Sequence, residues 1–278
     1  MTTLFAPGLF TQPFMLNAFL SGTLVAAVSG LVGFFVVIRG SAFVAHALPR
    51  IGFAGAAGAV LVNINPMFGL VAFALAGAVT MGGLGKKGQH DVVIALTLVA
   101  GLGTGALFLK LSKTYAAGAY ALLFGQLVGV SRAQLYTTIA IAAVCFVVVA
   151  LLYRPLLFAS VTRESAHARG VRVGAVDLLF LVVIGVATAI TVPVVGALLS
   201  FSLMIGPPAT AAHLTHRPGR AMALAAIISV ITVWIALVLG YDTAWPIGFF
   251  VAALSAAFYG GAHLVSAVRR GGEAVSSL

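Results

Sequence analysis

The chain has 278 residues, of which 62% are hydrophobic and 7% are charged, and its formal net charge is +10. A soluble domain carries about 25% charged residues. This composition therefore excludes a soluble enzyme and predicts an all-α, polytopic integral membrane protein. We expect residues 1–278 to form a single transmembrane domain, because the spans use nearly the whole length. The one cysteine, Cys145, cannot form an intramolecular disulfide.

Apolar stretches of about 20 residues, the length of a helix that crosses a bilayer, recur along the chain. They predict spans near 14–38, 43–63, 66–84, 92–110, 133–153, 176–192, 194–213, 220–240 and 245–267. The stretch 115–130 is shorter and favours a half-length helix buried in protein. Pro193 marks either a break between two spans or a kink in one. The pattern therefore allows eight or nine spans.

Glycines recur at short spacing inside two of these spans, at 52, 55 and 58 and again at 101, 103 and 105. Small residues let helix backbones approach closely in lipid. We expect most of them to lie at helix–helix contacts, and a minority to line a path or allow bending.

The basic residues predict the orientation. With the N-terminus outside the cell, the outer loops receive only Lys110, Lys113 and Arg132, and the other loop arginines and lysines fall inside. The positive-inside rule then predicts a plasma-membrane protein with a cytoplasmic C-terminus. Basic residues in such loops contact anionic lipid, so the net charge does not indicate a nucleic-acid partner.

One polar interruption, residues 154–173, falls on the cytoplasmic side in this topology. Thr162 is a candidate N-cap, Glu164 places negative charge in the first turn, and Gly170 stands where a helix would stop. These signals predict a two-turn helix, about 10 Å long. Such a helix is either a connector or a docking element for another protein.

Several ionisable groups fall in or beside the spans, where charge is costly. Asp91 and Asp177 are predicted in the first turns of their helices, where an acid is favourable. His213 and His263 are predicted at the interface. His46 is either a packed histidine or a ligand for a transition metal, because imidazole is the commonest protein ligand for such ions. No cysteine or carboxylate lies one helical turn from His46, and the residue four positions earlier is Ala42.

The chain lacks the material for catalysis. Residues 82–88 are rich in glycine, but Thr80 and Lys87 stand where a phosphate-binding loop needs glycine and serine or threonine. If ATP drives this protein, it is hydrolysed on another chain. No serine-hydrolase or zinc-protease motif is present, and five acidic residues offer little acid–base chemistry. We therefore expect no enzymatic activity.

An ordered set of short motifs spans roughly residues 30–245 and resembles the permease subunits of metal-ion ABC importers, the zinc and manganese uptake family. The set comprises VVIRG at 36–40, AHALP at 45–49, Asn65-Pro66, LFGQL at 123–127, ESAHARGV at 164–171, VVGALL at 194–199 and IGPPATA at 205–211. Each motif alone is weak, and the specificity comes from their order and spacing.

The resemblance implies a type II-like ABC importer permease that works as a homodimer. It also implies a separate cytoplasmic ATPase subunit that binds the ATP, an extracytoplasmic metal-binding protein, and a divalent metal as cargo, with no cofactor held by this chain. By motif, a coupling helix near 160–170 would dock in the ATPase through Arg163, Glu164, Ala168 and Gly170. His46 would contact the metal, and path or structural positions would be Asn65, Pro66, Asp91, Gln126, Pro207 and Pro208.

Two positions depart from the family pattern. The acid that stands four residues before the histidine is Ala42 here, and Gln126 replaces a residue that is often acidic. The match therefore supports the importer architecture better than any particular metal. Two other hypotheses remain open from the residues: a gradient-driven secondary transporter, and a membrane scaffold or intramembrane enzyme.

Overall fold

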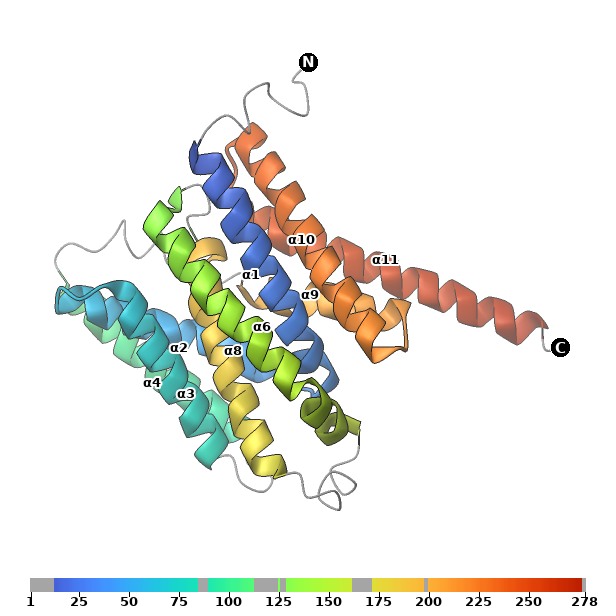
Figure 1. Cartoon of the computed structure of the whole chain (residues 1–278), viewed down its shortest axis with the longest axis horizontal. Helices are drawn as coiled ribbons and strands as arrows, with labels where there is room; N and C mark the ends of the chain where they lie inside the picture. The colour runs from blue at the N-terminus through green and yellow to red at the C-terminus, as the bar shows by residue number, and fades with distance from the viewer. Residues whose placement is uncertain are drawn as a thin grey trace.

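The computed structural model describes residues 13–84, 90–112, 125, 129–161, 172–197 and 200–276. Their regular structure is helical throughout (Figure 1). The helices are α1 (Pro13–Ile38), α2 (Ala42–Leu61), α3 (Pro66–Leu84), α4 (His90–Leu111), α6 (Arg132–Val161), α8 (Val173–Val195), α9 (Ser200–Leu214), α10 (Pro218–Thr243) and α11 (Ile247–Ser276). The prediction of an all-α membrane protein is confirmed, and the segment 115–130 lies almost entirely outside the described residues.

Eight of these helices are long and apolar enough to cross a bilayer. The exception is α9, whose 15 residues give a length of about 22 Å, short of the roughly 30 Å hydrocarbon core. The chain turns before α9 at Gly196, whose φ of 101° is open to glycine but strained for other residues. Pro193 lies in the last turn of α8, and the chain breaks three residues later, so of the two alternatives the break between two helices is the correct one.

Contacts between helices define two ends of the bundle. Arg39, which follows α1, meets Ser160 at the end of α6 and Asp177 near the start of α8, and we call this the Arg39 end. At the opposite end, called the Asn65 end, Asn65 lies with Ser131 and Val194 around one cavity. Helices α1, α6 and α9 run toward the Arg39 end, and α2, α8 and α10 start from it.

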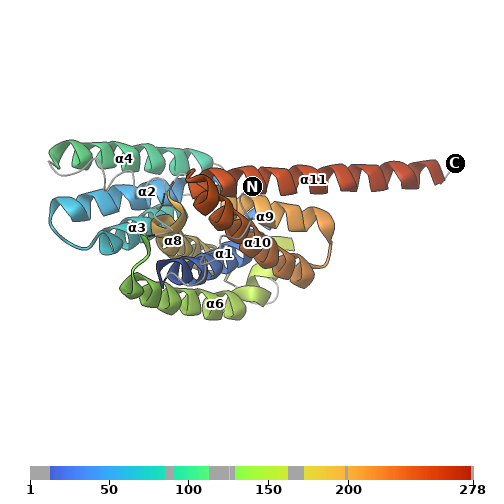
Figure 2. The same cartoon turned by 90° about the horizontal axis from the view of Figure 1, so that it is seen from above.

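The centre of the bundle is formed by α1 and α8, with α2, α3 and α4 on one side and α6 on the other (Figure 2). Phe34, Phe35 and Phe180 are the largest fully buried aromatic side chains of this core. Helix α4 is mostly exposed along its length, and α11 extends past the other helices at its C-terminal half (Figures 1 and 2). Large exposed apolar side chains such as Leu151 match a lipid-facing surface.

Close backbone contact holds α2 against its neighbours. A Cβ atom added to Gly55 would lie 2.1 Å from the carbonyl oxygen of Gly69 on α3, and one added to Gly105 of α4 would lie 3.0 Å from the Cβ of Ala54. A Cβ added to Gly103 would meet nothing within 4 Å. The prediction of small-residue packing is thus confirmed for Gly55 and Gly105, while Gly103 faces open space.

Candidate functional site

Helix α1 ends in a turn that points a charged side chain back into the bundle. The amide of Ser41 donates to the carbonyl of Val36 at 2.9 Å, and that of Gly40 donates to Val37 at 3.2 Å. With a φ of 65° at Gly40, this is a Schellman motif in which Arg39 is the C-cap. A cation here interacts favourably with the negative end of the helix dipole.

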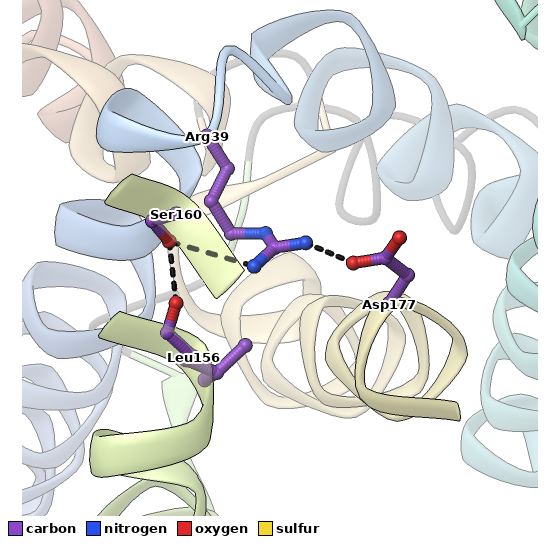
Figure 3. Close-up of polar contacts among 4 residues, drawn as sticks. All are labelled: Arg39, Leu156, Ser160 and Asp177. Carbon is purple, nitrogen blue, oxygen red and sulfur yellow. Dashed lines mark hydrogen bonds and ion pairs between the residues drawn. The ribbon is translucent and has the colours of Figure 1, made fainter. Parts of the chain in front are cut away.

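The Arg39 side chain joins three helices (Figure 3). Its Nη2 atom forms an ion pair with Oδ1 of Asp177 on α8. Its Nη1 atom donates to Oγ of Ser160 on α6 at 3.4 Å, and that hydroxyl donates to the carbonyl of Leu156 at 2.6 Å. We call Arg39, Ser160 and Asp177 the Arg39 cluster.

The cluster is partly removed from solvent. The side chain of Arg39 is 7% exposed and that of Asp177 is 30% exposed. The guanidinium carbon also lies 5.3 Å from the centre of the Phe180 ring, a cation–π contact. Removing two such charges from water costs several kcal/mol. The attraction between them offsets this cost only when their geometry is good. A charged group in such a position is a candidate for function.

Asp177 differs from its sequence-based expectation. It was predicted in the first turn of its helix, as a partner of the helix dipole. However, α8 begins at Val173, so the first turn contains no acid and Asp177 lies one turn further on. That prediction was wrong because the helix starts three residues earlier than the apolar run at 176.

The cluster lies where the chain leaves α6 and enters α8. Helix α6 ends at Val161, one residue after Ser160, and α8 begins four residues before Asp177. Between them, residues 162–171 lie outside the described part of the chain, and with them the predicted coupling residues Arg163, Glu164, Ala168 and Gly170. Their assignment stays a prediction.

His46 lies in the second turn of α2, near the Arg39 end, and is half-buried. Its ring is 4.9 Å from that of Phe201 on α9, in an edge-to-face arrangement. Arg50 donates from Nη1 to the carbonyl of His46 at 2.9 Å, which brings a cation close to it. Within the described ranges, no group of three or more His, Cys, Asp or Glu side chains gathers to hold a metal. The metal-contact role of His46 stays a prediction.

The predicted turn at Asn65 and Pro66 is confirmed. Asn65 caps α3, because its Oδ1 accepts a hydrogen bond from the amide of Met67 at 2.9 Å, and Pro66 is the first helical residue. Both residues border a cavity of about 500 Å³ between the start of α3, the start of α6 and the end of α8. Polar groups such as Gln134 and Thr138 line it, and none of the described residues that line it is charged.

The other predicted positions are scattered. Asp91 is exposed in the first turn of α4, as expected for a helix N-terminus. Pro207 and Pro208 are buried within α9, where a Cβ on Gly33 of α1 would lie 2.7 Å from the Pro208 ring. Gln126 lies outside the described residues. Asp91 and the two prolines lie on different helices from His46, which is on α2.

Two groupings were missed from the sequence. Arg39 and Asp177 were each explained by their local segment, although both fall at the same predicted membrane face, which was the available signal. The rings of His213 on α9 and His263 on α11 lie 5.5 Å apart, and Tyr259 is 5.3 Å from His213. Both histidines were predicted at an interface, but their contact was not.

Comparisons with known proteins agree on one family. The profile of the ABC 3 transport family matches residues 11–266. A manganese transport system membrane protein, MntC of Listeria monocytogenes, is 27% identical over 240 residues, which cover 86% of this chain and 85% of that protein. A manganese import system permease protein, ScaB of Streptococcus parasanguinis, is 26% identical and covers 93% of each. The fold resembles PsaBC from Streptococcus pneumoniae in complex with Fab, with a TM-score of 0.83 at 22% identity, covering 94% of this chain and 93% of that one.

Proposed function

The chain belongs to the ABC 3 transport family, and we propose that it is the membrane permease of an ATP-driven importer for a divalent metal ion. The observation that carries the proposal is the family match over residues 11–266, together with eight candidate spans in the part of the chain that the structure describes. Manganese is the first ion to test, because similar proteins are manganese transport and import proteins. Zinc is the second.

ATP binding and hydrolysis belong to a separate cytoplasmic subunit in this proposal. The chain has no phosphate-binding loop, so its own contribution is the path and the coupling to the ATPase. Residues 162–171 supply the docking element, and closure of the ATPase dimer tilts the spans between outward- and inward-open states. The permease works as a homodimer and receives the metal from an extracytoplasmic binding protein.

The Arg39 end is cytoplasmic in this assembly. The positive-inside rule supports this orientation, since Arg154, Arg172, Arg217 and Arg220 belong to helix ends on that side. The Asn65 end then faces the binding protein, with the N-terminus outside and the C-terminus in the cytoplasm.

His46 would contact the metal briefly on its way through. Ala42 supplies no carboxylate, and Arg50 places a positive charge near the ring, so a single imidazole gives a weak contact. Weak binding suits passage, because an ion that binds tightly in a path leaves slowly. Because Ala42 supplies no ligand, the choice between manganese and zinc would be made by other residues along the path.

Reconstitution tests the function directly. The permease, its ATPase and its binding protein are placed in proteoliposomes, and uptake of Mn²⁺ and Zn²⁺ is measured with and without ATP. We expect ATP-dependent uptake of at least one ion. Uptake by the permease alone, under an ion gradient and without ATP, would favour a secondary transporter instead. No ion flux under either condition would favour a scaffold.

A second measurement concerns His46. His46→Ala should lower uptake while the complex assembles normally, because the path loses its imidazole. His216→Ala is the matched control, since His216 is exposed in the turn before α10. If both variants take up metal as fast as the unmodified complex, His46 has a packing role and does not contact the metal.

A further inference from the structure

The Arg39 cluster connects two parts of the chain that the proposed mechanism needs to move together. Ser160 lies at the end of α6 and Asp177 near the start of α8, on either side of the α6–α8 connection, and Arg39 lies at the corner between α1 and α2. We propose that Arg39 is a positioning residue that transmits movement of the α6 and α8 ends to the start of α2. This inference rests on the proposed function, because it assigns a route for the coupling.

The corner is built to move as one piece with Arg39. Its amides bond back onto the last turn of α1, and the carbonyl of Ser41 accepts from the amide of Ala45 at 3.2 Å in the first turn of α2. His46 is the next residue along α2. A displacement of the groups that hold the guanidinium therefore reaches the predicted metal contact through a short, hydrogen-bonded stretch of chain.

Apolar packing already holds the three helices together without the ion pair. The ring centre of Phe35 on α1 lies 6.0 Å from that of Tyr153 on α6 and 6.3 Å from that of Phe180 on α8, and both pairs are edge-to-face. Replacing a buried ion pair by apolar residues of similar size is often neutral or stabilising. The stability of the fold thus does not require charge here, whereas a planar guanidinium with fixed donor directions specifies one relative position of the α6 and α8 ends.

A purely structural tie and a transmitting residue predict different results for one variant. Arg39→Met/Asp177→Leu removes both charges and keeps the volume. If the pair only ties helices together, this variant transports normally. If Arg39 transmits movement, the complex folds and hydrolyses ATP, but less metal crosses for each ATP consumed.

The experiment uses the full complex in proteoliposomes, with Mn²⁺ uptake and ATP hydrolysis measured on the same sample. We expect the uptake per ATP to fall about tenfold in Arg39→Met/Asp177→Leu, within the usual range of coupling between sites. The matched control is Arg132→Met/Asp242→Leu, which removes exposed charges at the start of α6 and near the end of α10 and should leave the ratio unchanged. The swapped pair, Arg39→Asp/Asp177→Arg, should recover part of the loss.

Hydrogen exchange on the same complexes provides the second readout. In the unmodified complex, ATP should change exchange in peptides covering 155–160 and 40–46. In the Met/Leu variant, we expect the change at 155–160 to remain and the change at 40–46 to disappear. Normal uptake per ATP, or an unchanged response at 40–46, would overturn the role of Arg39.

Two outcomes separate the levels of the proposal. If the unmodified complex shows no ATP-dependent uptake, the proposed function fails. If it transports and the Met/Leu variant transports equally, only the role of Arg39 fails. Should the Met/Leu variant not fold, Arg39→Lys decides the matter: it keeps the charge but loses the fork that reaches both Ser160 and Asp177. It should also lower uptake per ATP, and an unchanged ratio would overturn the inference.

Discussion

Two parts of the molecule hold helices together in opposite ways: one is the α2–α3 contact, and the other is the Arg39 cluster. At the first, Gly55 and Gly69 bring two backbones together, and no side chain fits between them. At the second, long polar side chains reach across from Arg39 to Ser160 and Asp177. Small-residue packing fixes the distance between two whole helices, whereas the polar cluster fixes the relative position of helix ends through a few directed contacts. The difference indicates a rigid α2–α3 unit and, at the Arg39 end, a joint whose parts move together.

The largest effect is expected at the rigid contact. Gly55→Ala would force the backbones of α2 and α3 apart, because its Cβ would lie 2.1 Å from the carbonyl oxygen of Gly69. Overpacking of this kind costs about 3 kcal/mol. The midpoint of thermal aggregation in detergent measures it. Gly103→Ala is the control, and similar midpoints for the two variants would contradict the close contact.

Asp177→Ala should be the next most damaging. It leaves the guanidinium of Arg39, 7% exposed, without its carboxylate partner. Leaving a buried charge unpaired costs about 3 kcal/mol, and the contacts with Ser160 and Phe180 offset part of this. The same thermal assay applies, and a midpoint equal to that of Asp242→Ala would show that the pair contributes nothing to stability.

Arg39→Ala should cost less, about 2 kcal/mol, because the remaining carboxylate is 30% exposed and water screens it better. The double variant Arg39→Ala/Asp177→Ala should cost less than the two single losses added, since each single change removes the same interaction between the two charges. Strict additivity in this cycle would argue against a direct interaction.

The smallest effect is expected for Ser160→Ala. Its hydroxyl lies 3.4 Å from the guanidinium, a long hydrogen bond, and polar contacts between membrane helices contribute on average about 0.6 kcal/mol. A shift of the thermal midpoint as large as that of Asp177→Ala would show that the hydroxyl, rather than the charge pair, orders the joint.

Local signals predicted much of the fold. The span at 66–84 matches α3 to the residue, and the turn at Asn65-Pro66 was recognised from a dipeptide whose cap bond the structure contains. The partnership of Arg39 with Asp177 was not predicted, because 138 positions separate them and each had an adequate local explanation. The sequence also did not show which glycines lie at helix contacts. Lipid and protein interior are equally apolar, so the two faces of a membrane helix differ little in hydrophobicity.

The sequence by itself determined that this chain is a polytopic membrane protein of the metal-ion ABC permease type, because its composition and the order of its motifs can be recognised without a structure. Only the tertiary structure decided that the chain breaks at Gly196 between α8 and α9, that Gly55 rather than Gly103 meets a neighbour, and that Arg39 pairs with Asp177. The physical reason is common to all three. Length and hydropathy act along the chain, whereas contact and charge pairing depend on which helices the fold places side by side.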